Sequence, residues 1–161
     1  MKIVIIVGIS RNNIIGDKNG MPWHYAADFK HFRRTTRGCP FVVGRKTFES
    51  FQVRPLPGRL NIVLTRNAQY QVPKGVLVFS ELAETLTHCR SLGTEKLFVL
   101  GGAQIYRQAL PLTDEMVITH IPKVIDGDTS FPAWDKAAWQ IVDKREEDGL
   151  SFITYARIKP A

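Results

Sequence analysis

Residues 3–9 read Ile3-Val4-Ile5-Ile6-Val7-Gly8-Ile9, an almost unbroken run of apolar side chains, most of them β-branched. The run is far too short to span a bilayer. It follows Lys2, as the apolar part of a signal peptide would, but no small-residue cleavage site follows it. Such a run is typical of a strand that is buried on both faces of a sheet.

Shorter apolar runs, each bounded by Gly, Pro or charge, recur at 41–43, 60–64, 76–79, 97–100 and 116–121. Few of them alternate with polar residues, which favours interior strands of a sheet covered on both faces. Stretches with helical features separate them, at 26–35, 46–51, 80–90 and 103–110. We expect Ser80 to cap the third helix and Pro111 to end the fourth.

This alternation predicts an α/β fold, a single domain over residues 1–161 with a mostly parallel sheet and right-handed crossovers. The C-terminal part differs. Residues 139–146 and 150–158 flank a turn at Asp148-Gly149 and predict a hairpin, so that at least one strand runs antiparallel. In such sheets, ligands bind beyond the carboxyl ends of the strands.

The composition, 44% hydrophobic and 23% charged, predicts an ordinary soluble globular protein. The net charge of +7 suits an anionic partner, either nucleic acid or a polyanionic small molecule, but a solvated basic surface would also explain it. The basic residues are spread out without interleaved aromatics, which argues against nucleic-acid binding. Cys39 and Cys89 show neither metal spacing nor a disulfide framework, and the four histidines form no cluster. We therefore expect a reduced, cytoplasmic protein without a metal site or a membrane span.

The segment that follows the first strand holds the first candidate site residues. Residues 15–23, IGDKNGMPW, form a loop whose glycines and apolar residues suit a mobile lid, although Trp23 could equally fill the core. Asp28 lies in the first turn of the next predicted helix, where an acid usually interacts with the helix dipole. Alternatively, Asp28 is a carboxylate in an apolar cleft beside Phe29 and Phe32, where it accepts paired hydrogen bonds from an amidine-like heterocycle.

Further candidates lie at the predicted strand ends, and each of them could instead be an ordinary turn. Gly44-Arg45-Lys46-Thr47 joins a strand to a helix and offers free amides and two cations to an anion, although it is not a P-loop. Thr65-Arg66 suits a phosphate, and Gly101-Gly102 permits close approach of a ligand. Arg59 ends the proline-rich bend at 54–59, which could aim it at a carboxylate. No GxGxxG dinucleotide fingerprint occurs.

The joint order of these motifs resembles the dihydrofolate reductase family, in its bacterial monomeric type, over essentially the whole chain. The motifs that carry the resemblance are Ile15-Gly16, Met21-Pro22-Trp23, Asp28, Gly44-Arg45-Lys46-Thr47, Arg54-Pro55-Leu56-Pro57-Gly58-Arg59-Leu60-Asn61, Gly101-Gly102 with Tyr106, Thr119-His120-Ile121 and Gly127-Asp128-Thr129-Ser130-Phe131-Pro132. The resemblance implies an eight-stranded, mostly parallel sheet with an antiparallel C-terminal strand, flanked by helices. It also implies reduction of 7,8-dihydrofolate to tetrahydrofolate by NADPH.

The resemblance also implies how the substrate is held. Asp28 would bind the pterin ring and favour protonation at N5, Thr119 would bond to that carboxylate, and Trp23 would position an ordered water. Arg59 would bind the α-carboxylate of the glutamate tail. The pterin site would be completed by Ile6, Phe29, Phe32, Leu56 and Leu100. Antifolates of the methotrexate and trimethoprim classes would bind there too, and a monomer is expected.

For NADPH, the resemblance places the nicotinamide against Gly8, Ile15 and Gly16. Phosphates would bind at Gly44, Arg45, Lys46 and Thr47, and the 2′-phosphate that distinguishes NADPH from NADH at Thr65 and Arg66. Further cofactor contacts would come from Gly101, Gly102, Ala103, Gln104, Ile105 and Tyr106, with a cis peptide joining the two glycines. The loop at 16–21 would close over the nicotinamide, with residues 127–131 packed against it.

Two alternatives accompany this interpretation. The nearer one is a related NADPH-dependent pterin or pyrimidine reductase, such as the reductase of riboflavin synthesis, with the same fold and another substrate. Asp28 together with Arg59 favours a pterin that bears a glutamate tail. The other alternative is a basic nucleic-acid-binding domain, which would bind in a strongly salt-dependent manner. Ala103 departs from the family pattern, since a third glycine is frequent there, and its methyl group could crowd the pyrophosphate.

Overall fold

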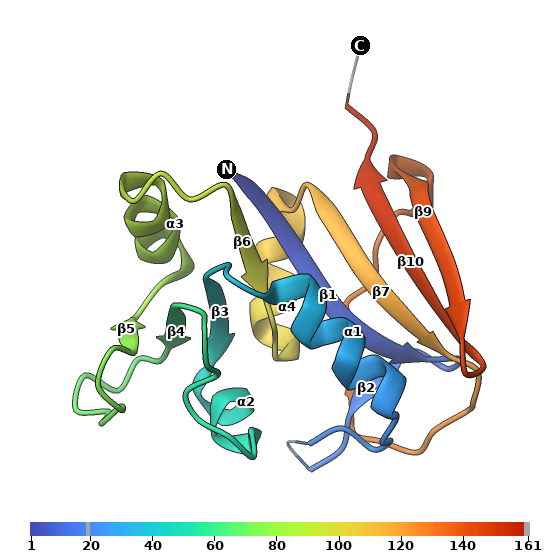
Figure 1. The fold of residues 1–161 in the computed structure, drawn as a ribbon, viewed down its shortest axis with the longest axis horizontal. Helices are drawn as coiled ribbons and strands as arrows, with labels where there is room; N and C mark the ends of the chain where they lie inside the picture. The colour runs from blue at the N-terminus through green and yellow to red at the C-terminus, as the bar shows by residue number, and fades with distance from the viewer. Residues whose placement is uncertain (19, 160–161) are drawn as a thin grey trace.

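An eight-stranded sheet runs through the protein in the order β5-β4-β3-β6-β1-β7-β10-β9 (Figure 1). The structure, a computed structural model, describes residues 1–18 and 20–159. The strands of this sheet are β1 (Lys2–Ser10), β3 (Phe41–Gly44), β4 (Asn61–Leu64), β5 (Leu77–Phe79), β6 (Lys96–Val99), β7 (Glu115–Ile121), β9 (Trp139–Glu147) and β10 (Leu150–Arg157). Two short strands, β2 (Ile14–Gly16) and β8 (Thr129–Ser130), pair separately.

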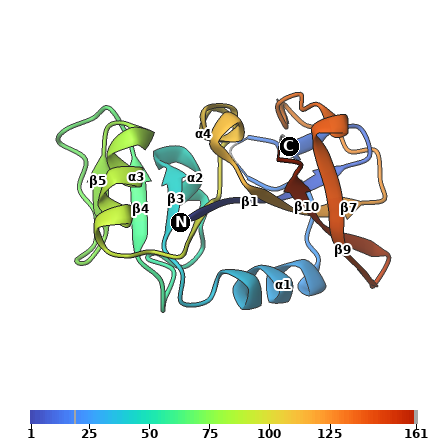
Figure 2. The ribbon, with the colours of Figure 1, turned by 90° about the horizontal axis from the view of Figure 1, so that it is seen from above.

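The helices lie on both faces of the sheet, and α1 and α4 lie on opposite sides of it (Figure 2). The described α-helices are α1 (Ala26–Thr36), α2 (Arg45–Ser50), α3 (Leu82–Ser91) and α4 (Ala103–Ala109), and two 3₁₀ turns follow at Leu110–Leu112 and Lys136–Ala138. Within the described residues, no helix has the length and apolar character that crossing a bilayer requires.

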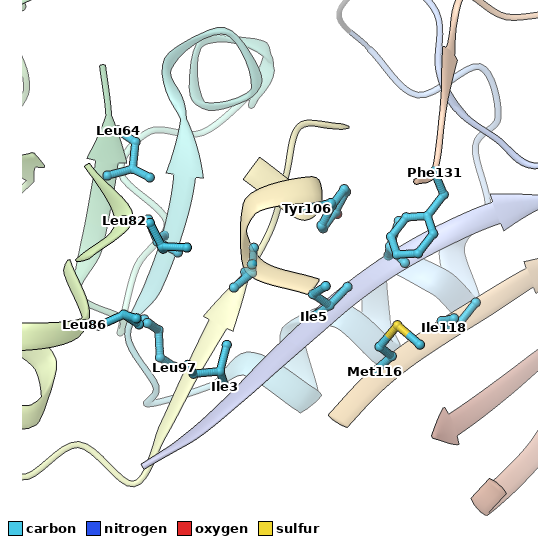
Figure 3. Packing of buried hydrophobic residues seen from close by; sticks show 14 of the residues in the cluster. Ile3, Ile5, Leu64, Leu82, Leu86, Leu97, Tyr106, Met116, Ile118 and Phe131 are labelled. Atoms are coloured by element: carbon cyan, nitrogen blue, oxygen red, sulfur yellow. The ribbon is translucent and has the colours of Figure 1, made fainter. Parts of the chain in front are cut away.

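The central position of β1 in the sheet explains why its sequence is apolar throughout. β1 lies between β6 and β7 and pairs in parallel with both. Ile3 and Ile5 point into the core cluster that α3 and α4 cover (Figure 3), whereas Val4 and Ile6 point into the cluster on the α1 side. All four side chains are at most 6% exposed. Both faces of β1 are therefore core, as the sequence predicts.

The C-terminal hairpin is confirmed, because β10 runs antiparallel to both β7 and β9. The expected cap of the third helix is wrong by one residue. Glu81 is the N-cap of α3 and its backbone N–H donates to the Glu84 side chain, while the Ser80 hydroxyl donates to the same carboxylate at 2.7 Å. A glutamate at the third helical position makes the reciprocal contact of a capping box, and this fixes the helix start one residue later.

Candidate active site

The candidate residues gather where the sequence places them, at the carboxyl edge of the parallel strands. Gly8 lies near the end of β1 and is paired with Thr119 of β7. On the other side of β1, Gly44 ends β3 opposite Leu64, the last residue of β4. Leu100 directly follows β6 and is 8% exposed. This edge is where open α/β sheets bind ligands.

Asp28 and Thr119 form the polar centre of the first group. The Thr119 hydroxyl donates to Oδ1 of Asp28 at 2.8 Å. Gly8 faces the same carboxylate, because a Cβ there would lie 3.6 Å from Asp28 Oδ2 and only 3.1 Å from the Trp23 ring. The bare backbone of β1, the indole and the carboxylate therefore lie close together.

Burial raises the pKa of the Asp28 carboxyl, and the hydrogen bond from Thr119 partly opposes that increase. Burial likewise raises the pKa of Tyr106, and the charge of Asp28 raises it further. The Tyr106 hydroxyl stays protonated and donates to the Ile6 carbonyl at 2.9 Å. A half-buried carboxylate with a raised pKa in a ligand-binding edge is characteristic of a functional site.

Both interpretations of Asp28 can be compared with its surroundings. The residue does lie in the first turn of α1, but Tyr25 is the N-cap and no side chain caps that helix end. Its carboxylate accepts a hydrogen bond from Thr119, on a different element. Nearby, Nε1 of Trp23 is buried and has no hydrogen-bond partner among the described residues. Such an N–H is normally satisfied by water or a ligand.

Arg59, in the bend before β4, lies against the C-terminal end of α1 and beside Phe32. Its guanidinium is 5.9 Å from the Phe32 ring centre and donates to the Thr36 hydroxyl at 3.0 Å, while Nε donates to the Pro57 carbonyl. Burial and the neighbouring Arg33 lower the pKa of Arg59, although a guanidinium remains charged in proteins. Two neighbouring cations favour an anionic group between them.

Asn61 fixes the bend that carries Leu56 and Arg59. Its side chain accepts a hydrogen bond from the Leu56 N–H and donates to the carbonyls of Leu56 and Arg59, all within 2.9 Å. Asn61 is 2% exposed. Leu56 packs, together with Phe32, against the core cluster on the α1 side. The bend is thus held from the start of β4, and Arg54-Pro55 is a cis peptide within it.

The second group surrounds the two glycine junctions. The Gly44 N–H donates to the Gly101 carbonyl at 2.8 Å, and Gly101-Gly102 is the expected cis peptide. A Cβ on Gly102 would lie 3.1 Å from the Thr47 hydroxyl, and one on Gly44 would lie 3.3 Å from Ile105. The starts of α2 and α4 therefore converge, and glycine permits that approach.

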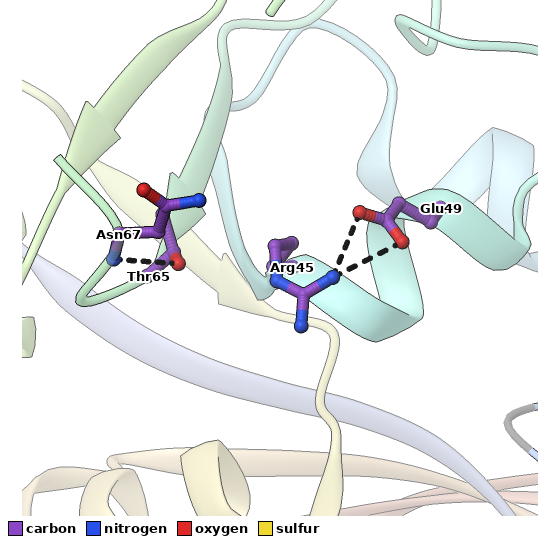
Figure 4. Close-up of polar contacts among 4 residues, drawn as sticks. All are labelled: Arg45, Glu49, Thr65 and Asn67. Carbon is purple, nitrogen blue, oxygen red and sulfur yellow. Dashed lines mark hydrogen bonds and ion pairs between the residues drawn. The ribbon is translucent and has the colours of Figure 1, made fainter. Parts of the chain in front are cut away.

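Cations and hydroxyls border these junctions (Figure 4). Arg45 donates through Nη1 to both carboxylate oxygens of Glu49, at 3.0 and 3.3 Å. On the neighbouring strand end, the Thr65 hydroxyl accepts from the Asn67 N–H at 3.1 Å. Lys46 and Arg66 are exposed at the same two strand ends. An exposed, cationic surface beside free backbone suits a polyanion.

The loop after β1 contains more structure than the sequence predicts. β2 pairs with β8, and Asp17 and Gly20 exchange two backbone hydrogen bonds. Asn19, inside the expected lid, lies outside the described residues. A Cβ on Gly127 would lie 2.5 Å from Ile14 Cγ2 and 2.7 Å from the Gly16 carbonyl, so only glycine permits this contact. The expected packing of residues 127–131 against the loop is therefore present, and β8 provides it.

The remaining residues expected in the site make fewer contacts with the two groups described above. Ile15 packs against the core beneath α4, and Ala103 begins that helix. Gln104 is exposed, and the Phe29 ring contacts His24 with ring centres 4.9 Å apart. Sequence reasoning missed Glu49 and Thr36, although Glu49 stands four positions after Arg45, a spacing that signals a helical ion pair. The described residues contain no group of three or more metal-ligating side chains.

Known proteins of one family match almost the whole length of this chain. The family model for dihydrofolate reductase matches residues 2–157. The dihydrofolate reductase of Neisseria meningitidis serogroup A and the type 3 enzyme of Salmonella typhimurium are each 42% identical, and each alignment covers 98% of this chain and 99% of the relative. A solved structure, Enterococcus faecalis dihydrofolate reductase complexed with NADP(H) and RAB-propyl, is 31% identical with a TM-score of 0.89, over 98% of this chain and 97% of that one. One edge of the sheet holds the carboxylate, the two glycine junctions and the cationic strand ends, and the relatives match this chain almost from end to end. The chain therefore belongs to the dihydrofolate reductase family.

Proposed function

We propose that the protein catalyses the NADPH-dependent reduction of 7,8-dihydrofolate to tetrahydrofolate, which supplies one-carbon metabolism, and that residues 1–161 form one catalytic domain. The observation that carries the proposal is the half-buried Asp28 carboxylate, held by Thr119 beside the bare backbone of Gly8. The site lies between a bend that presents Arg59 and a cationic edge that begins at Arg45. Membership of the dihydrofolate reductase family indicates the class of reaction, the reduction of dihydrofolate.

The residues present fit a dinucleotide phosphate. Gly44 and Gly102 leave the backbone bare where α2 and α4 converge, and a Cβ at either position would contact its neighbours at 3.3 Å or less. Around them stand the candidate phosphate ligands Arg45, Lys46, Thr47, Thr65 and Arg66. Gly8, Ile15 and Gly16 would lie along the nicotinamide. When bound, NADPH supplies the hydride that reduces C6 of the substrate.

Asp28 is proposed to orient the pterin ring. Its carboxylate would accept hydrogen bonds from N3 and the 2-amino group, a paired contact that fixes the plane of the ring. Thr119 fixes the carboxylate itself and would complete its contact with the amino group. Phe29, Phe32, Leu56 and the backbone at Ile6 and Leu100 would enclose the ring and exclude water. Alignment and exclusion of water contribute much of the rate in such a reaction.

The proton delivered to N5 is proposed to depend on the same carboxylate. A group whose pKa is raised by burial exchanges protons closer to neutral pH than an exposed aspartate does. Nε1 of Trp23, which has no hydrogen-bond partner within residues 1–18 and 20–159, would bind a water next to the carboxylate and the substrate. Arg59 would bind the α-carboxylate of the glutamate tail, at the opposite end of α1.

Further features follow from the same proposal. The β2–β8 pair would support the loop that closes over the nicotinamide. Loop movement or product release would then contribute to the turnover time. Antifolates of the methotrexate and trimethoprim classes would compete for the Asp28 site. We propose a cytoplasmic monomer that binds no nucleic acid.

Steady-state oxidation of NADPH by the purified protein tests the proposal. Oxidation should require dihydrofolate, stop on addition of methotrexate, and be absent with the pyrimidine substrate of the riboflavin-pathway reductase. A folded protein that binds NADPH but oxidises it only with the pyrimidine would overturn the assigned substrate in favour of the sister reductase.

A further inference from the structure

The side chain of Glu49 lies beside the cationic edge and has no place in the roles described above. It is on α2, one turn after Arg45, and about as exposed as Arg45, with 39% and 36% of the two side chains exposed. Both carboxylate oxygens contact the same guanidinium nitrogen, Nη1, at 3.0 and 3.3 Å. The contact therefore leaves Nη2 and Nε of Arg45 available to another acceptor (Figure 4).

The pKa of the same carboxylate also depends on a second segment. The Arg45 guanidinium is the main cause that lowers the pKa of Glu49, and the Tyr70 hydroxyl lowers it further. Burial raises the pKa of Tyr70, and the charge of Glu49 raises it further. Tyr70 is half-buried and packs against the core cluster on the α1 side, in the loop that follows Arg66. Glu49 thus lies on α2 and near the loop after β4, the two segments that carry the proposed phosphate ligands.

The strand register makes this connection relevant to the ligand. Gly44 and Leu64 are paired, so Arg45 and Thr65 are the next residues along two adjacent strands. An anion bound between these strand ends would lie within reach of both side chains. An arginine side chain loses considerable conformational entropy when it is fixed, and a partner that fixes it beforehand removes that cost from binding.

We propose that Glu49 is a positioning residue for the cofactor: it holds the Arg45 guanidinium with one edge toward the 2′-phosphate of NADPH and thereby contributes to selectivity over NADH. The inference rests on the proposed function in its choice of ligand. A negative charge near a phosphate also repels it, and the experiment distinguishes this repulsion from the positioning of Arg45.

Dissociation constants for NADPH and NADH, measured by quenching of tryptophan fluorescence without substrate, test the inference. Glu49→Ala should weaken NADPH binding about twofold to fivefold, in the range of an exposed arginine–carboxylate contact, and leave NADH binding nearly unchanged. Glu49→Gln keeps the side-chain shape and should lie in between. Glu147→Ala breaks a comparable exposed ion pair, Arg145–Glu147 at 2.7 Å, outside the candidate site and is the matched control, with no effect expected.

A double-mutant cycle separates positioning of Arg45 from simple support of α2. In an Arg45→Ala background, Glu49→Ala should have no further effect on NADPH binding. Equal losses in both backgrounds, or tighter NADPH binding by Glu49→Ala and Glu49→Gln, would overturn the inference while leaving the proposed function intact. A wild-type protein that does not bind NADPH would instead contradict the proposed function itself.

Discussion

The Thr119 hydroxyl donates a 2.8 Å hydrogen bond to Oδ1 of Asp28, a residue 91 positions earlier in the chain. The bond joins β7 to the start of α1 across the end of β1. It holds the Asp28 carboxylate against a second element as well as in the first turn of α1. Two of the predictions below depend on it.

Asp28→Asn should reduce the rate of dihydrofolate reduction by orders of magnitude near neutral pH and leave NADPH binding nearly unchanged. An amide has the size of the carboxyl group but lacks the charge and one acceptor, so the ring loses its paired contact. Steady-state rates and NADPH titrations of both proteins measure the two effects. Unchanged turnover in the variant would exclude the role assigned to Asp28.

Thr119→Val should raise the pKa of Asp28 further, because the hydrogen bond from Thr119 is what opposes the effect of burial. Valine has nearly the shape of threonine, so packing in β7 should change little. The titration of Asp28 can be followed by carbon NMR of a labelled protein, with Asp28→Asn used to assign the signal. An unchanged or lowered pKa in Thr119→Val would contradict the account of this pair.

Arg66→Ala should weaken NADPH binding much more than NADH binding, because only NADPH carries the 2′-phosphate. A charged hydrogen bond to a phosphate contributes about 1.5–3 kcal/mol, which corresponds to a loss of roughly tenfold to a hundredfold. Titration with each cofactor measures the ratio. Equal losses for the two cofactors would exclude Arg66 as a ligand of the 2′-phosphate.

Asn61→Ala should destabilise the fold and disorder the bend that carries Arg59. The substitution leaves one backbone N–H and two carbonyls without their present partner, at a position only 2% exposed. Unsatisfied buried groups of this kind cost about 1–3 kcal/mol each, and partial access to water reduces the sum. Urea unfolding gives the loss of stability, and the KM for dihydrofolate should rise. A protein of normal stability and KM would show that the bend does not depend on Asn61.

His31 should make the fold less stable in acid. Burial, Arg145 and Arg34 lower its pKa from 6.5 to about 4, against a smaller opposing effect of Glu147. The unfolded chain therefore binds a proton more readily, and stability falls as the pH decreases from about 6.5 toward 4, by about 1–2 kcal/mol after solvent screening. His31→Gln should show a smaller decrease over this interval in urea unfolding. Parallel curves for the two proteins would contradict this prediction.

The sheet could be predicted from the sequence because its signal is local. Runs such as 3–9 and 116–121 have to be buried on both faces, and their composition shows it directly. β2 and β8 could not be predicted in this way, since three and two residues carry no periodic pattern. Their pairing depends instead on Gly127, which allows one backbone to approach the other.

The candidate site depended more on the order of motifs than on any single motif. Composition alone left Asp28 between two interpretations, and its contact with Thr119 could not be inferred from residues 91 positions apart. Arg45 was recognisable as a cation at a helix start, and the spacing to Glu49 was visible. The nearness of Tyr70 to Glu49, however, arises only in the fold and could not be inferred from the sequence.

Transfer of the label from NADPH carrying deuterium at the reactive C4 position tests the central claim most directly. After a single turnover with 7,8-dihydrofolate, the account predicts one deuterium at C6 of the tetrahydrofolate formed and none at N5, which takes its proton from solvent. Tetrahydrofolate without deuterium at C6, or no product from a folded protein that binds both ligands, would contradict it.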